Sequence, residues 1–258
     1  MGIKGAAIAT MLSWVFGLGF ILYLLAYKRK LIDLKIPSIA HFIRTNKAML
    51  KIGLPAAGAN MLTPIAAAIM TAVVATYGEE AVAAFGVGSR IESIACLVVL
   101  ALSMTLPPFI SQNFGAGQMH RVEEAYKVSL KFIMGWQVLI YVVLILTSGL
   151  IADVFTDDEQ VAYVIKLFIW ILPLGYGLQG IIILTNSSLN ALHRPMAALV
   201  LSIIRLFVCY VPLAYLGSLM FELEGFFIGA LIGNLVMAGI SYSIFAKQFE
   251  NEPFEVSS

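Results

Sequence analysis

Residues 128–152 read VSLKFIMGWQVLIYVVLILTSGLIA, and this stretch decides the fold class. It carries a single charge, Lys131, and lacks the alternation of apolar and polar positions typical of a membrane β-strand. About 20 apolar residues in a helix cross roughly 30 Å of hydrocarbon, so the stretch predicts a transmembrane helix. A helix is the expected form because it satisfies its own backbone hydrogen bonds in lipid.

Six further runs of this kind occur in the 258 residues: Gly5–Tyr27, Leu54–Tyr77, Val82–Ile110, Val161–Leu184, Ala197–Leu219 and Phe226–Phe245. The chain is 60% hydrophobic and 12% charged, against roughly 45–50% and about 25% in soluble domains. This composition excludes a disordered chain, a disulfide scaffold and a water-soluble enzyme domain. The net charge of +1 gives no indication of a nucleic-acid partner. We therefore predict an all-α polytopic membrane protein with seven transmembrane helices and the lipid bilayer as its partner.

The charges of the connecting segments alternate in sign. Lys and Arg prevail in residues 28–52, 113–127 and 185–196, whereas the turns at 79–80, 153–159 and 222–224 are acidic. Because cytoplasmic loops carry the Lys and Arg excess, this pattern predicts a multi-pass protein of the cell (inner) membrane. It places the first residue outside and the last residue in the cytoplasm. Residues 28–52 are also expected to include an amphipathic helix that starts near Pro37 and Ser38 on the membrane surface.

Prolines and glycines predict interruptions of the spanning helices. Gly53 to Pro55 is expected to open the second helix, and Pro64 to kink it. The pair that begins at Pro107 is expected to end the third helix, and Pro173 to break the fifth. Residues 175–180 fit the pattern G-x-G-x-x-G, but no strand precedes them, so a dinucleotide site is not indicated. The stripe at residues 225, 229 and 233 predicts close approach of a neighbouring helix.

Two charged residues are expected near the middle of the membrane. Glu92 follows the acidic turn at Glu80 by twelve residues, and Arg205 follows Pro195 by ten, which is about 18 Å and about 15 Å along a helix. Because intramembrane charges need partners, we predict that Glu92 and Arg205 meet directly or through water. Arg90 is an alternative partner. Such a pair could fix helix register or serve transport.

Sequence motifs for hydrolytic, nucleotide-binding or metal chemistry do not occur in the chain. The histidines His41, His120 and His193 lie far apart in loop segments, and no Cys/His cluster has metal-ligand spacing. We therefore expect neither an enzyme nor a bound metal or organic cofactor.

Several ordered motifs together identify a family. They are MGIKGAAIAT at Met1–Thr10, GLP at Gly53–Pro55, QNFGAG at Gln112–Gly117, SLNALHRP at Ser188–Pro195 and PLAYLG at Pro212–Gly217. In this order the motifs resemble those of the multidrug and toxic compound extrusion (MATE) transporters, and the resemblance extends from the first residue to about Phe245. Members of that family have twelve transmembrane helices in two six-helix lobes.

The resemblance implies a domain organisation. Residues 1–27 correspond to the last helix of the N-terminal lobe, 28–52 to the cytoplasmic linker between lobes, 53–246 to the C-terminal six-helix lobe and 247–258 to a cytoplasmic tail. It also implies that the chain begins partway through a longer transporter and that its partner is an N-terminal lobe.

The implied function is efflux of amphipathic, often cationic, drug-like compounds in exchange for protons or sodium ions. The expected substrate and cation pathway comprises Asn60, Thr63, Glu92, Gln179 and Asn186. Met61, Met70 and Met104 also fit a site for varied ligands, since thioethers repack easily. Ordinary packing against lipid or in the core is the favoured interpretation of all three.

One departure from the family pattern concerns ion coupling. In the sodium-coupled branch, the seventh and tenth helices carry acidic residues, and the aligned positions here are Thr63 and Gln179. Neither side chain can carry a charge, so the sequence favours proton coupling through the N-terminal lobe, with Glu92 as the remaining intramembrane carboxylate. Alternative functions are a lipid-linked oligosaccharide flippase of related fold and a truncated membrane protein that does not transport.

Overall fold

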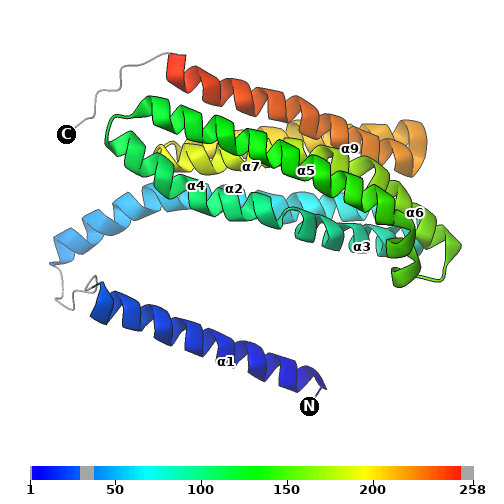
Figure 1. Cartoon of the computed structure of the whole chain (residues 1–258), viewed down its shortest axis with the longest axis horizontal. Helices are drawn as coiled ribbons and strands as arrows, with labels where there is room; N and C mark the ends of the chain where they lie inside the picture. Colours follow the sequence, from blue (N-terminus) through cyan, green and yellow to red (C-terminus); the bar gives the residue numbers. More distant parts are fainter. Residues whose placement is uncertain (1, 30–37, 251–258) are drawn as a thin grey trace. The chain divides into compact units, whose positions relative to one another are not determined.

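The computed structural model of the chain describes residues 2–29 and 38–250, and every regular element in these ranges is helical (Figure 1). Contacts divide the chain into two units, residues 1–48 and 49–258. Part of the predicted linker, residues 30–37, and the predicted tail after residue 250 lie outside the described residues.

The first unit contains α1 (Gly2–Tyr23), which continues as the π-helical segment η1 (Leu24–Lys28). Its apolar side chains are exposed: Trp14 is 77% exposed and Phe16 is 76% exposed. A helix that is apolar on all sides and has no buried face within its own unit is suited to lipid or to another membrane helix. This agrees with its prediction as a spanning helix, which residues 7–28 satisfy by length and composition.

Helix α2 (Ile39–Ala75) is longer than predicted. Its start agrees with the expected amphipathic helix, because the Ser38 hydroxyl accepts a hydrogen bond from the His41 N–H. The predicted new start at Gly53 to Pro55 is wrong, since Pro55 and Pro64 both lie inside the helix. Each proline removes only one N–H from the ladder, and no residue near position 53 supplies a competing N-cap.

Within the described residues, the second unit continues with nine helical elements after α2. They are α3 (Glu79–Ala95), α4 (Leu97–Gly115), α5 (Met119–Phe155), α6 (Glu159–Ile171), η2 (Leu172–Gly175), α7 (Tyr176–Ala191), α8 (Pro195–Ile203), η3 (Ile204–Tyr210) and, after these, α9 (Val211–Glu250). In the described residues six stretches are long and apolar enough to cross a membrane. The last of them, residues 195–247, contains a non-helical reversal at Phe221 and Glu222, so it contributes two crossings. The predicted seven-helix membrane fold is confirmed.

The third predicted helix does not end at Pro107. Helix α4 contains both Pro107 and Pro108 and continues to Gly115. Its end is set by Gly117, which adopts a left-handed φ of 71° while the Gln118 N–H donates to the Asn113 carbonyl at 2.8 Å. This glycine-based cap gives hydrogen-bond partners to carbonyl groups in the last turn of α4. The cap, and not the prolines, therefore decides where the helix stops.

The glycine stripe brings the two arms of α9 close together. A methyl group at Gly225 would lie 2.0 Å from the carbonyl oxygen of Gly217, and one at Gly229 would lie 2.1 Å from that of Leu213. Only glycine leaves room for backbones at this distance. The predicted close approach is therefore found, and the neighbouring helix is the preceding arm of the same hairpin.

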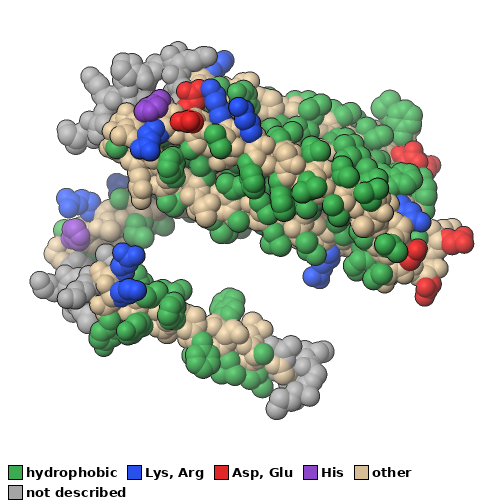
Figure 2. Space-filling model, in the orientation of Figure 1, with side chains coloured by type: hydrophobic (Ala, Val, Ile, Leu, Met, Phe, Trp, Pro, Cys, Tyr) green, Lys and Arg blue, Asp and Glu red, His purple; other side chains and the backbone are tan. Residues whose placement is uncertain are grey.

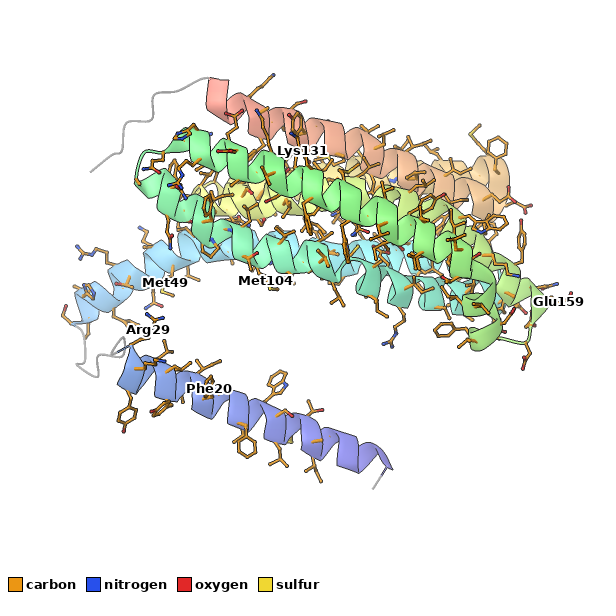
Figure 3. The ribbon with its side chains drawn as sticks, viewed as in Figure 1. Phe20, Arg29, Met49, Met104, Lys131 and Glu159 are labelled. Atoms are coloured by element: carbon orange, nitrogen blue, oxygen red, sulfur yellow. The ribbon has the colours of Figure 1, made fainter. Side chains whose placement is uncertain are left out.

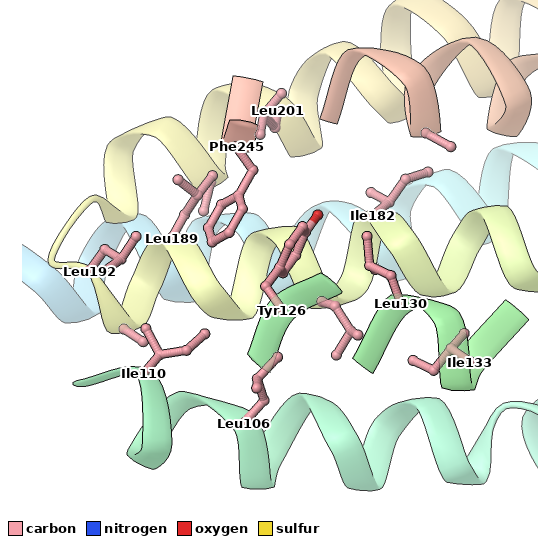
Figure 4. Close-up of a cluster of buried hydrophobic side chains, with 14 of the residues drawn as sticks. Leu106, Ile110, Tyr126, Leu130, Ile133, Ile182, Leu189, Leu192, Leu201 and Phe245 are labelled. Atoms are coloured by element: carbon pink, nitrogen blue, oxygen red, sulfur yellow. The ribbon is translucent and has the colours of Figure 1, made fainter. Parts of the chain in front are cut away.

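The core of the second unit surrounds α7, which packs against α4, α5, α8 and α9. Figure 4 shows one apolar cluster in which the Tyr126 and Phe245 rings lie 4.0 Å apart between their centroids. The Tyr126 hydroxyl is joined to the Thr185 hydroxyl by a 2.6 Å hydrogen bond. Apolar side chains also cover the sides of the bundle, and most charged side chains lie towards its ends (Figure 2). This distribution is that of a protein surrounded by lipid.

Candidate functional site

Glu92 is the centre of a polar group inside the helical bundle. It lies in the last turn of α3, and its Oε1 accepts a hydrogen bond of 3.0 Å from the Nε2 of Gln179 on α7. The two residues are 87 positions apart in sequence. The structure thus brings together two of the predicted pathway residues, and the amide supplies the polar partner that a carboxylate among membrane helices needs.

Three irregularities of the backbone adjoin this carboxylate and its neighbours. Helix α3 stops at Cys96, four residues after Glu92, where φ is −88° and ψ is 2°. The 3₁₀ segment η2, which contains Pro173, ends four residues before Gln179. Arg205 lies within the π-helical segment η3. A π-helix is rare in proteins overall but occurs often at functional sites. We therefore take this polar group, with three helix irregularities beside it, as the candidate site.

Arg205 does not form the predicted direct salt bridge with Glu92. Within the described part of the chain the salt bridge shorter than 4.0 Å joins Lys127 and Glu123 on the exposed face of α5. The Nε of Arg205 is buried and has no hydrogen-bond partner. Gln179 therefore takes the position predicted for the arginine, and a contact through water stays a prediction.

A buried glutamine that the sequence analysis did not consider supports the break between α3 and α4. The Nε2 of Gln137 on α5 donates to the carbonyl of Ala95 at 3.2 Å, and the side chain is 3% exposed. Ala95 is the last residue of α3, so this bond gives a partner to a carbonyl at the helix break. A lone amide within the apolar run at 128–152 was the available signal for this role.

The predicted residues on α2 stay apart from this group. Asn60 and Thr63 are exposed, and in the described structure no hydrogen bond joins them to Glu92 or Gln179. Met61 and Met104 are 66% and 74% exposed, and Figure 3 shows Met104 on the outside of α4. Both methionines are free to meet a ligand or lipid.

Met70 is different from the other two methionines. It is 2% exposed and belongs to the apolar cluster that also contains Val74 and Phe227. Ordinary packing, the interpretation favoured for the three methionines, therefore holds for Met70, because its thioether fills the core.

Asn186, the last of the predicted residues, lies on α7. Its Nδ2 donates to the hydroxyl of Ser202 on α8 at 3.1 Å, and its Oδ1 is buried with no partner. The described residues contain no group of three or more His, Cys, Asp or Glu side chains that could hold a metal ion.

Comparison with known proteins decides the family. The family model MatE matches residues 55–216. The chain belongs to the MATE family of transporters. It is 40% identical to a FAD transporter of Shewanella oneidensis over 93% of this chain, and 24% identical to the probable multidrug resistance protein NorM of Thermotoga maritima over 91%.

Solved MATE structures share the fold. A crystal structure of a mutant of the Vibrio cholerae MATE transporter VcmN matches 98% of this chain with a TM-score of 0.92 and 32% identity, and covers 57% of that transporter. The two curated relatives are covered over 53% and 50% of their lengths, so the chain spans about half of each. The matched half is the C-terminal one, which agrees with a C-terminal lobe preceded by one helix.

Proposed function

We propose that this chain forms the C-terminal lobe of a secondary active exporter that exchanges its substrate for protons or sodium ions. The observation that carries the proposal is the carboxylate of Glu92, held by Gln179 between three interrupted helices of a MATE-type lobe. Ionising a carboxylate in the low-dielectric interior of a protein costs much free energy. The cost is smaller in a conformation that exposes the carboxylate to water, so its protonation state shifts the balance between conformations. This coupling of charge to conformation is what an antiporter requires.

Protons are the ion that the polar group favours. The hydrogen-bond partner of Glu92 is one neutral amide, that of Gln179, and in the described residues no set of oxygen ligands surrounds the carboxylate. A sodium ion needs several oxygen atoms, as hard cations do in general. The sequence favours coupling in the N-terminal lobe, and the hydrogen-bonded carboxylate of Glu92 makes the C-terminal lobe a second candidate.

Two substrate classes are supported. The relatives named multidrug export proteins, such as MepA of Staphylococcus haemolyticus with 26% identity, support amphipathic drug-like compounds. The higher identity of 40% to a protein named a FAD transporter supports an aromatic anionic substrate such as FAD, for which Arg205 supplies a positive charge. A flippase for lipid-linked oligosaccharides stays the alternative within transport.

Export also requires the other half of a MATE transporter. We propose an N-terminal lobe of similar size as the partner, because the relatives are about twice as long as the matched region. An antibody against residues 250–258 tests this in source membranes. A band near twice the mass of this chain supports a covalent partner lobe. A band at the mass of this chain requires a separate N-terminal lobe, which co-purification would identify.

The functional test is flux in proteoliposomes made with protein purified from source membranes. Efflux of ethidium and of FAD is followed after a pH jump or a sodium jump. We expect a pH gradient to drive one of these substrates, and Glu92→Gln to remove the dependence on the gradient. Glu124→Gln is the matched control, since Glu124 is exposed on α5 outside the polar group. Flux that ignores both gradients contradicts the antiport proposal.

A further inference from the structure

A polar stripe runs along one face of α7. Gln179, Asn186 and Asn190 are seven and four residues apart. At about 100° per residue, both asparagines lie within about 20° of the direction of Gln179. Positions between them, such as Ile182 and Leu189, are fully buried in the apolar core. The stripe is therefore a line of amides along one face of α7, and the buried hydroxyl residues Thr185 and Ser188 lie on other faces of the helix.

The amides of this stripe have unmet hydrogen-bonding capacity. The Oδ1 atoms of Asn186 and Asn190 are both buried with no partner. An unsatisfied buried acceptor costs about 1–3 kcal/mol, and native proteins usually satisfy such groups with internal water. Because these two acceptors lie on one face of α7, a single set of water molecules can satisfy both.

The facing helix offers matching groups. Helices α7 and α8 pack against each other, and the hydroxyl of Ser202 on α8 accepts from Asn186. Three residues further along lies Arg205, whose buried Nε has no acceptor. Unused acceptors on α7 and an unused donor on η3 thus occur along neighbouring segments, and water, which donates and accepts, can satisfy both kinds of group.

The length of the stripe fits a path from the polar group to the membrane surface. Gln179 and Asn190 are eleven residues apart, which is about 16 Å along a helix and about half of the hydrocarbon thickness. Gln179 contacts Glu92 at one end. At the other end α7 stops at Ala191, next to the polar turn at 192–194.

We propose that the face of α7 formed by Gln179, Asn186 and Asn190 holds a file of water molecules that connects Glu92 with the turn at 192–194. The bound ligand is water, held by amide oxygens, the Ser202 hydroxyl and the Arg205 guanidinium. A role of this file in carrying protons to Glu92 rests on the proposed antiport. The hydration itself does not depend on transport.

Reactivity of introduced cysteines with silver ions tests the hydration, because a buried thiol reacts only where water reaches it. Asn186→Cys, Asn190→Cys and Leu189→Cys are each made in a background with Cys96→Ala and Cys209→Ala, in permeabilised source membranes. Leu189 is the control, since it is fully buried in the core and nearer the end of α7 than Asn186. We expect Asn186→Cys to react at least about tenfold faster than Leu189→Cys, although position 186 lies farther from the end of α7 than position 189.

A second variant separates hydration from local unfolding. Adding Asn190→Leu to Asn186→Cys closes the outer part of the path and is expected to slow the silver reaction at position 186 by about tenfold. A rate at position 186 that equals the rate at 189, or that is unchanged by Asn190→Leu, overturns the proposal. Neither rate involves substrate or a gradient, so this result and the flux test of the export proposal can fail independently.

Discussion

Replacing Gly229 with alanine is expected to force the arms of the α9 hairpin apart. The new methyl carbon would lie 2.1 Å from the carbonyl oxygen of Leu213 and 2.9 Å from the Cα of Ala214, whereas ordinary contact begins at 3.4 Å. The first shortfall is 3.4 minus 2.1, or 1.3 Å, and it falls on backbone atoms that cannot rotate away. Overpacking of this kind costs about 1–3 kcal/mol. At about 2–4 °C per kcal/mol for a chain of this size, we expect the melting temperature to fall by about 2–12 °C.

Melting can be followed with a thiol-reactive fluorescent dye, because Cys96 and Cys209 are both buried and become reactive on unfolding. Gly239→Ala is the matched control on the same helix, since a methyl group there meets nothing within 4 Å. Alanine stabilises a helix relative to glycine, so Gly239→Ala is expected to melt at or slightly above the parent temperature. If Gly229→Ala and Gly239→Ala melt together, the tight packing of the hairpin arms is refuted.

Three further predictions concern buried contacts, each checked by the same melting assay. Gly88→Ala is expected to lower the free energy of unfolding by about 1–3 kcal/mol, because its methyl group would overlap the Phe168 ring. Adding Phe168→Leu to this variant should recover part of the loss. If the losses of the two substitutions simply add, the contact is contradicted. Tyr126→Phe is expected to cost about 1 kcal/mol in the parent and much less after Thr185→Val, since the hydroxyl pair is then already broken. Gln137→Leu is expected to cost about 1–3 kcal/mol by leaving the last carbonyl of α3 unpaired, and an unchanged melting temperature would show that this bond is dispensable.

The number and nature of the helices follow from the sequence because hydrocarbon thickness imposes a length on every spanning run. Residues 128–152 form a single unbroken helix for this reason. The positions of the helix ends were harder to predict than the number of helices. Pro107 indicated a stop, but the cap formed by Gly117 decides the end of α4, and a proline inside a membrane helix removes only a local hydrogen bond.

The candidate site was partly predictable. Depth arguments identified Glu92 and Arg205, because charged residues are rare in membrane spans. The choice of partner depends on helix rotation and on the π-helical segment at Arg205, neither of which has a sequence signature here. Gln179 was expected in the pathway as a position that lacks a carboxylate, whereas the structure shows it donating a hydrogen bond to one. Packing was the favoured interpretation of all three methionines, but only the structure tells the core thioether of Met70 from the exposed ones of Met61 and Met104.

The most direct test of the central claim is substrate flux against gradient in proteoliposomes containing the purified protein. Ethidium or FAD is loaded on one side, and an inward pH gradient is then imposed, reversed or abolished with an ionophore. We expect export that follows the direction of the gradient in the parent protein and in Glu124→Gln, and flux that no longer responds to the gradient in Glu92→Gln. Gradient-driven export that Glu92→Gln leaves unchanged would contradict a coupling role for this carboxylate and would place coupling in the N-terminal lobe.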